Sequence, residues 1–276
     1  MEVGISDFSA LERDGWADSA TAASYAEGFA GAARQCVAAM VEAVGTVPGI
    51  DALDLCCGHG IVARGLADSG ATVTGVDFSP AMLAMAREAV PEGDFVEADA
   101  AALPFEDASF DVVTAGFGIP HLPDPEHCFT EVRRVLRPGG RFAFSVWQAP
   151  PASQAFGFLF AAVAEHGHES VTLPPGPGAH DYADLDTAGP ALMAAGFEAP
   201  RLDTVDSYWL IDDPATPYDF MYEGTVRGAA LLRPQPEDNK AAIREAMCRM
   251  VRSHCGDRAP WRVAIPAAIV SARVPA

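Results

Sequence analysis

Closely spaced glycines and a set of aspartates are the residues whose types and spacing indicate chemistry in this chain. The stretch Asp51-Ala-Leu-Asp-Leu-Cys-Cys-Gly-His-Gly60 predicts a buried strand with Asp54 near its end, followed by a turn built on Gly58 and Gly60. Glycine lacks a Cβ, so the backbone of such a turn can come close to a ligand. A helix beginning at Ile61 would point its unbonded N–H groups and partial positive charge back at the turn. The stretch therefore predicts a crevice where a nucleotide-like ligand docks.

Asp77 and Asp99 extend this pattern to two further predicted strands, 71–77 and 94–99, each of which ends in an aspartate. Asp77 follows Gly58 by 19 positions, which is the spacing at which a carboxylate accepts hydrogen bonds from ribose hydroxyls. Any one of these aspartates alone could be a helix cap. Together they predict a row of carboxylates that can meet a cationic amino group, a ribose diol and an amine-bearing base.

Alternating strands and helices must position these side chains. Such a rhythm predicts a parallel sheet with right-handed crossovers. Helices are expected at 61–69, from Ser79-Pro80 onward, and at 125–136, 154–166, 187–195 and 238–254. Further strands are expected at 111–115, 141–147, 201–211 and 261–274, with a turn at 137–140 before the strand at 141.

The predicted domain organisation is a central core with helical additions. Residues 1–45 are expected to form an N-terminal helical cap segment, because Ser19 to Val44 has an apolar stripe at helical spacing that Asp18 or Ser19 could cap. The simpler alternative is that this helix only packs on the sheet. The remaining predicted parts are a core at 46–148, a helix with a Pro/Gly lid at 149–183, and the end of the sheet at 184–276 with a helical cap insertion at 212–258.

Composition restricts the class of partner. The 276 residues include 18 basic and 38 acidic side chains, for a formal charge of −20. This charge argues against nucleic acid and against anionic membrane surfaces, which attract basic clusters. We expect no membrane insertion, because no run of about 18 apolar residues occurs. The six cysteines and seven histidines lack metal-ligand spacing, so we expect no metal and a reduced, cytoplasmic protein.

Five motifs in order make the stretch 50–148 resemble class I S-adenosylmethionine-dependent methyltransferases. They are Leu-Asp-Leu-Cys-Cys-Gly-His-Gly, Val-Asp-Phe-Ser-Pro-Ala-Met-Leu, Glu-Ala-Asp-Ala-Ala-Ala-Leu-Pro-Phe, Ser-Phe-Asp-Val-Val and Val-Leu-Arg-Pro-Gly-Gly-Arg. Within that superfamily, Thr-Ala-Gly-Phe-Gly-Ile-Pro-His-Leu-Pro-Asp is similar to the ubiquinone/menaquinone C-methyltransferase group and its small-molecule relatives. One departure is Cys56, which stands where the family usually has its first glycine.

The resemblance implies a fold, a cofactor and a site. The implied fold is an α/β, Rossmann-like, doubly wound sheet of seven strands, the last two antiparallel, here with a helical cap. The implied cofactor is S-adenosyl-L-methionine, and the implied partner is a small-molecule methyl acceptor. Carried over to this sequence, the cofactor-binding residues are Asp54, Cys56, Gly58 and Gly60 for the methionine moiety, Asp77 for the ribose, Phe78 and Met82 beside the adenine, Asp99 and Ala100 at the adenine amino group, and Gly116 at the ammonium.

The predicted reaction is methyl transfer to carbon or oxygen of a small apolar or aromatic metabolite. His121 is the candidate base, because it follows the fourth strand at the crevice and imidazole titrates near neutral pH. Two alternatives stay open. The run Gly58 to Ala63 fits G-x-G-x-x-G/A, as in an NAD(P)-dependent oxidoreductase, and a methyltransferase-like protein could bind the cofactor without transferring methyl.

Overall fold

The computed structural model describes residues 2–276, with side chains described from residue 7 onward. The chain divides into two compact units. The sheet unit comprises residues 33–147, 177–205 and 267–276, and the helical unit comprises residues 2–32, 148–176 and 206–266. Residues 33–45, which were expected in the N-terminal cap segment, lie in the sheet unit because α4 (Val37–Val44) packs against the sheet and α5 (Ile61–Asp68).

In the sheet unit, the described residues form a seven-stranded sheet in the order β3-β2-β1-β4-β5-β9-β6. All neighbouring strands are parallel except β9, which runs antiparallel to both β5 and β6. This confirms the predicted doubly wound sheet with antiparallel final strands. The strands are β1 (Asp51–Leu55), β2 (Thr72–Asp77), β3 (Asp94–Glu97), β4 (Phe110–Gly116), β5 (Leu136–Trp147), β6 (Glu198–Val205) and β9 (Ala267–Arg273).

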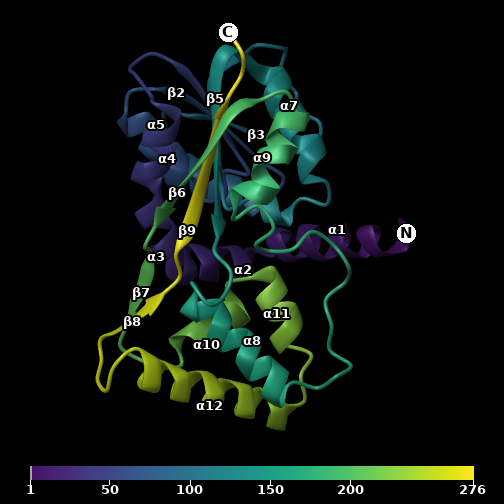
Figure 1. Cartoon of the computed structure of the whole chain (residues 1–276), viewed down its shortest axis with the longest axis vertical. Coiled ribbons are helices and arrows are strands. Elements are labelled where there is room, and N and C mark those ends of the chain that lie inside the picture. The colour runs from purple at the N-terminus through teal and green to yellow at the C-terminus, as the bar shows by residue number, and fades with distance from the viewer. Residues whose placement is uncertain (1) are drawn as a thin grey trace. The chain divides into compact units, whose positions relative to one another are not determined.

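Helices cover both faces of this sheet (Figure 1). On one face α4 packs against α5, and on the other α7 packs against α9. Pro125 and Pro80 each stand at the first position of their helix, where a missing N–H costs nothing. The remaining helices of the unit are α6 (Pro80–Ala89), α7 (Pro125–Val135) and α9 (Leu185–Ala194), with short 3-10 turns η2 (Arg34–Cys36) and η3 (Ile119–His121).

The core of the sheet unit is aromatic where α7 meets β5. Phe129, Phe142 and Phe144 are fully buried, and the rings of Phe129 and Phe144 stack with centroids 5.5 Å apart. Burying each such side chain stabilises the fold by about 1.5–3 kcal/mol. The rigid sheet they support fixes the carboxyl ends of β1, β2 and β4, where the predicted site lies.

The helical unit contains a chain of aromatic rings. Tyr25, Phe29, Trp209 and Phe220 make successive ring contacts, with centroids 4.9 to 5.6 Å apart, and the Trp209 indole N–H donates to the Phe29 carbonyl at 3.1 Å. Its elements are α1 (Glu2–Ala17), α2 (Ser19–Ser24), the π-helix η1 (Tyr25–Phe29), α3 (Ala30–Ala33), α8 (Gln154–His166), β7 (Tyr208–Ile211), α10 (Thr216–Glu223), α11 (Val226–Leu232), α12 (Glu237–His254) and β8 (Trp261–Ala264).

Two predicted strands are wrong in their extent. The strand expected at 201–211 is divided into β6 and β7, and the strand expected at 261–274 into β8 and β9. Pro266 lies between β8 and β9 and has no N–H for the ladder. Ser207, which precedes β7, makes two hydrogen bonds with Ile265 instead. The Ile265 N–H donates to the Ser207 carbonyl at 3.0 Å, and the Ser207 hydroxyl donates to the Ile265 carbonyl at 2.6 Å.

The helix predicted from Ser19 to Val44 is also interrupted. Asp18 caps its start as expected, accepting from the Thr21 N–H at 2.8 Å. The helix then widens into η1 and later tightens into η2. Gly28 within η1 gives a reason, because a Cβ there would lie 2.8 Å or less from the Phe220 ring. The interruption is therefore part of the packing of the aromatic chain.

Two further differences concern short segments. The third strand ends at Glu97, so Asp99 lies beyond it, and the turn predicted at 137–140 falls within β5 as a register irregularity between β4 and β5.

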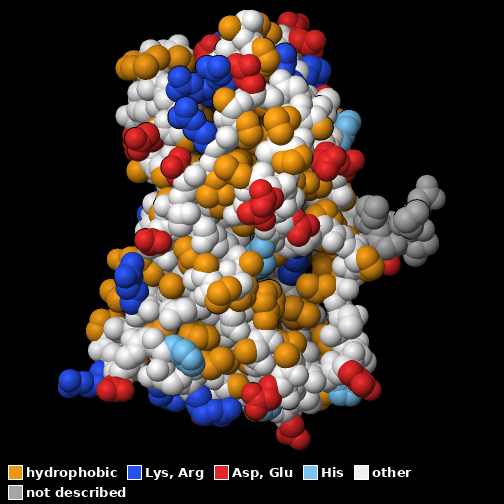
Figure 2. Space-filling view, viewed as in Figure 1, with side chains coloured by type: hydrophobic (Ala, Val, Ile, Leu, Met, Phe, Trp, Pro, Cys, Tyr) orange, Lys and Arg blue, Asp and Glu red, His pale blue; other side chains and the backbone are white. Residues whose placement is uncertain are grey.

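Acidic side chains are scattered over the face seen in Figure 2, with small groups of basic side chains among them. Among the described residues, no helix combines the length and apolarity needed to cross a membrane.

Candidate functional site

The glycine turn follows β1 and leads into α5, as predicted. Gly58 and Gly60 have φ angles of +53° and +85°, a backbone conformation that favours glycine. The two glycines face different surroundings. A Cβ on Gly60 would lie 3.1 Å from the Ala86 Cα, so this glycine lets α6 approach. A Cβ on Gly58 would have only the Met82 sulfur near it, at 3.9 Å, so Gly58 leaves space beside the turn.

Cys56 occupies the position where the resemblance expects a first glycine. Its φ is +51°, so the backbone is left-handed there despite the side chain. Gly118, after β4, accommodates this departure: a Cβ on Gly118 would lie 2.9 Å from the Cys56 sulfur and closer still to its Cβ. Burial raises the pKa of the Cys56 thiol. Cys56 is therefore a protonated packing group, and its fit depends on a glycine in another loop.

Asp54 is buried, at 1 % exposed, and both of its oxygens have partners. One accepts from the Thr114 hydroxyl at 2.8 Å, and the other accepts from the Ala63 N–H at 2.9 Å. Ala63 is in the first turn of α5, whose N–H groups lack helical partners. Burial raises the pKa of Asp54 to about 7, against the lowering effect of these two hydrogen bonds. Asp54 thus joins β1, β4 and α5, which fixes the turn between them.

Asp77 lies at the carboxyl end of β2 and is 8 % exposed. Its carboxylate accepts from the Gly58 N–H and from the Ser79 N–H, both at 2.9 Å. Burial raises its pKa, while these backbone donors and the nearby charge of His121 lower it. A carboxylate offers about four acceptor sites, so Asp77 can still accept from a ligand. The structure therefore brings together the turn and the carboxylate that the spacing of 19 residues predicted.

The residues predicted at the adenine follow β2 and β3. Phe78 is half-buried, and Met82 is buried on α6, where its N–H donates to the Ser79 hydroxyl at 3.3 Å. Asp99 is exposed and accepts from the Ala101 N–H at 2.9 Å, as an aspartate does in a turn. Ala100 is buried. The carboxylates of Asp54 and Asp77 are thus at strand ends, whereas Asp99 is in the following loop.

The segment after β4 contains features that the sequence analysis missed. Gly116 ends β4, and a Cβ on it would lie 2.8 Å from a Val62 methyl. Phe117 has a φ of +59°, which is a strained conformation for an aromatic residue. Its N–H donates to the Ser145 hydroxyl at 3.0 Å, and its ring stacks on Trp147 at a centroid distance of 3.9 Å. Local strain of this kind is often found at functional sites.

The histidines lie in both units of the chain and in different surroundings. His121 ends η3 and is half-buried, close enough to Asp77 to affect the pKa of that carboxyl. His59 is in the glycine turn, and burial, with a smaller effect of Arg34, lowers its pKa to about 4. His166 and His168 belong to the helical unit, and the Nδ1 of His180, in the sheet unit, lies 2.8 Å from the Trp147 carbonyl oxygen.

Comparison with known proteins agrees with this geometry. A family model described as "Methyltransferase domain" matches residues 53–144, which include the turn, Asp77 and the segment after β4. The demethylmenaquinone methyltransferase of Clavibacter sepedonicus is 36 % identical over 179 residues, covering 58 % of this chain and 70 % of that protein. The proteins of the same name from Renibacterium salmoninarum and Thermus thermophilus are 40 % and 45 % identical, with matches covering 40 % and 39 % of this chain and 47 % and 51 % of those proteins. The chain therefore spans about half the length of several relatives it matches.

Solved structures share the fold. The YcgJ protein of Bacillus subtilis has a TM-score of 0.58 at 18 % identity, over 87 % of this chain and 98 % of that one. Phosphoethanolamine N-methyltransferase 2 of Haemonchus contortus, in complex with S-adenosyl-L-methionine, has a TM-score of 0.53 at 20 % identity, over 87 % of this chain and 52 % of that one. From its fold, its glycine turn and its relatives, this chain belongs to the family of S-adenosylmethionine-dependent methyltransferases.

Proposed function

We propose that this protein transfers the methyl group of S-adenosylmethionine to a small apolar or aromatic acceptor, at carbon or oxygen. The single observation that supports this most is the 2.9 Å hydrogen bond from the Gly58 N–H to Asp77. This bond joins the open glycine turn to a buried carboxylate at the carboxyl end of the next strand. Ligands of open α/β sheets bind outside these strand ends.

The residues present fit the cofactor. Space beside Gly58 lets a ligand approach the backbone, and Asp77 keeps acceptor capacity for sugar hydroxyls. Phe78 and Met82 would flank the base, Asp99 and Ala100 would meet its amino group, and Gly116 would offer its carbonyl to the ammonium. Asp54 would act mainly by holding the turn, because both of its oxygens already have protein partners.

The chemistry divides between cofactor and chain. When bound, S-adenosylmethionine supplies an electrophilic methyl group for in-line displacement. The chain must then align the acceptor and exclude water. His121 would accept the proton released by a phenolic or enolic acceptor, because it lies near Asp77 at the same edge of the sheet. The charge of Asp77 would stabilise the imidazolium that results.

We propose a reduced naphthoquinone as the acceptor class. Relatives that match at 36 to 47 % identity are named demethylmenaquinone methyltransferases. The buried, stacked pair of Phe117 and Trp147 places apolar rings at the carboxyl ends of β4 and β5, the edge of the sheet at which the acceptor would lie. On this proposal the partner is a small molecule rather than a nucleic acid, the protein does not insert into membranes, and it works in the cytoplasm.

The test is transfer of radiolabelled methyl from S-adenosylmethionine to a reduced, prenylated 1,4-naphthoquinone that lacks the ring methyl group. We expect labelled quinone with the wild-type chain and at least a tenfold lower rate with Asp77→Asn at limiting cofactor. Asp94→Asn is the matched control, because this aspartate is exposed at the start of β3, away from the strand ends that form the site, and we expect the rate to stay within twofold. Cofactor binding without transfer to any acceptor would contradict the proposed activity, and binding of NADH in its place would contradict the cofactor.

A further inference from the structure

The site described above contains carboxylates, glycines and the histidines His59 and His121, but no arginine or lysine among the residues described there. The methionine part of S-adenosylmethionine ends in a carboxylate as well as an ammonium group. Asp54 and Asp77 can attract the ammonium, but they repel the carboxylate. A positive side chain beside the glycine turn would add a charged partner for this carboxylate to the N–H groups of the turn, and neither the sequence motifs nor the comparisons identify one.

Four of the nine arginines of the sheet unit form ion pairs with carboxylates. Lys240, the only lysine in the sequence, belongs to the helical unit. Arg64 on α5 forms ion pairs with Asp68 and Glu92, at 2.8 and 2.7 Å. Arg134 pairs with Glu131 and Asp107, Arg137 with Asp51 and Asp111, and Arg273 with Glu198. These arginines stabilise helices and strand ends, and their charges are already compensated.

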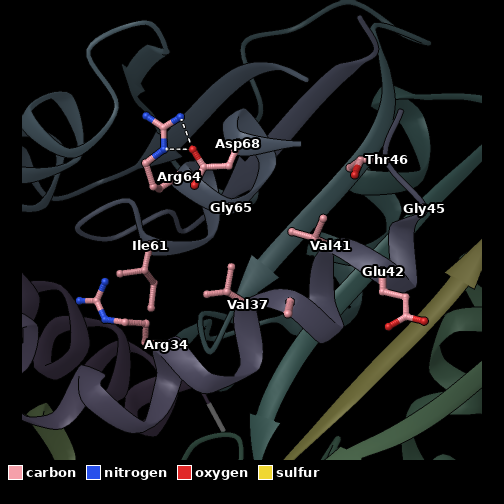
Figure 3. A pocket seen from close by; sticks show the side chains of 11 residues that line it. Arg34, Val37, Val41, Glu42, Gly45, Thr46, Ile61, Arg64, Gly65 and Asp68 are labelled. Atoms are coloured by element: carbon pink, nitrogen blue, oxygen red, sulfur yellow. Dashed lines mark hydrogen bonds and ion pairs between the residues drawn. The ribbon is translucent and has the colours of Figure 1, made fainter. Parts of the chain in front are cut away.

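Arg34 differs from them in its place and its surroundings. Its side chain is exposed, and no ion pair links it to the residues that the structure describes. It lines an open pocket of about 770 Å³ between α4 and α5. Figure 3 shows Arg34 and Ile61 at the same end of this pocket, and Ile61 is the residue that directly follows the glycine turn.

Local packing holds Arg34 in this place. Arg34 begins η2, the short turn that leads into α4, and Val37 at the start of α4 lies so close to α5 that a Cβ on Gly65 would overlap it. Glycine at residue 65 therefore lets the two helices make close contact, and the start of α4 cannot move far from the turn. The charge of Arg34 also reaches the turn, since it contributes to the lowered pKa of His59.

We propose that the Arg34 guanidinium binds the carboxylate of the methionine part of S-adenosylmethionine at the end of the glycine turn. This inference rests on the proposed function. Arginine presents a planar fork of donors that matches a carboxylate, which gives strong charge-assisted hydrogen bonds. Arg34 is thereby a cofactor-binding residue outside the matched family model, which begins at residue 53.

The test compares two ligands that differ in the amino-acid part. S-adenosylhomocysteine carries the carboxylate, whereas 5′-methylthioadenosine has the same nucleoside without it. Affinities for both are measured by titration calorimetry with the wild type, Arg34→Ala, Arg34→Lys and Arg64→Ala. Arg64→Ala is the matched control, because Arg64 lines the same pocket but is already paired.

We expect Arg34→Ala to weaken S-adenosylhomocysteine binding at least tenfold and to change 5′-methylthioadenosine binding less than twofold. Arg34→Lys should fall between wild type and alanine, and Arg64→Ala should leave both affinities within twofold. Unchanged S-adenosylhomocysteine affinity in Arg34→Ala would overturn the inference, and so would an equal loss for both ligands, which would mean that Arg34 only supports the turn. A wild type that binds neither ligand would instead contradict the proposed function.

Discussion

Replacing Gly118 with alanine tests how the family's glycine turn tolerates a cysteine. Gly118 has φ and ψ of −80° and −35°, which alanine adopts freely, so the backbone is not the obstacle. The obstacle is steric, because the new Cβ would lie 2.9 Å from the Cys56 sulfur and closer still to its Cβ. Cys56 cannot easily move away, since its left-handed backbone is bounded by Leu55 in β1 and by the glycine turn.

Overpacking of this kind costs about 1 to 3 kcal/mol. In a Cys56→Gly background the overlap disappears, and Gly118→Ala should then stabilise the fold by about 0.4 to 1 kcal/mol through the unfolded chain. The sign of the effect therefore reverses between the two backgrounds. The coupling energy is the sum of the two effects, about 1.5 to 4 kcal/mol.

The assay is urea unfolding of the four proteins of this double-mutant cycle. Their free energies of unfolding are compared with one shared m value, the slope of the free energy against urea concentration. Gly31→Ala is the matched control, because a Cβ on Gly31 would meet nothing within 4 Å, and we expect it to be neutral or stabilising. If Gly118→Ala costs the same stability with cysteine and with glycine at residue 56, the steric account of Cys56 is wrong.

Three further predictions concern other parts of the site. Burial raises the pKa of Asp54 to about 7 from 3.8, so the folded state holds the proton more tightly and stability is lost as the pH rises between these values. Relative to Asp54→Asn, the wild type should therefore lose up to about 4 kcal/mol of unfolding free energy from pH 4 to pH 8, measured by urea titration. A difference between the two proteins that does not depend on pH would refute the raised pKa. His121→Ala should lower kcat about 100-fold while changing the Kd of S-adenosylhomocysteine less than threefold, and an unchanged kcat would remove it as the base. Ser145→Ala should cost about 1 to 3 kcal/mol in the free energy of unfolding, because it leaves the buried Phe117 N–H without its acceptor. The control is Ser109→Ala, at a half-buried serine whose hydroxyl donates to the Glu106 carbonyl, and equal costs would count against this role of Ser145.

Local patterns were enough to predict the fold because each signal has a short-range cause. The glycine turn, the proline at the start of α6 and the aspartate that caps α2 all act within a few residues. The order of the motifs then indicated the family and, with it, the antiparallel strand that no local pattern specifies. The structure confirms these elements, including the helix predicted at 154–166.

The features that the sequence analysis missed depend on contacts between distant segments. Cys56 and Gly118 belong to different loops, so their match is visible only once β1 and β4 are neighbours. The bond from Phe117 to Ser145 similarly requires the pairing of β4 with β5. Pro266 was a possible signal for the divided strands, because its missing N–H interrupts a ladder. Arg34 had no signal in the motifs, since its relation to the turn arises from the packing of α4 on α5.

A crystal structure of the chain with S-adenosylhomocysteine would test the central claim most directly. We predict that both ribose hydroxyls lie within about 3 Å of the Asp77 carboxylate, with the amino-acid part over the turn from Gly58 to Gly60. A nucleoside bound with its sugar away from Asp77, or with no contact to the glycine turn, would contradict the account.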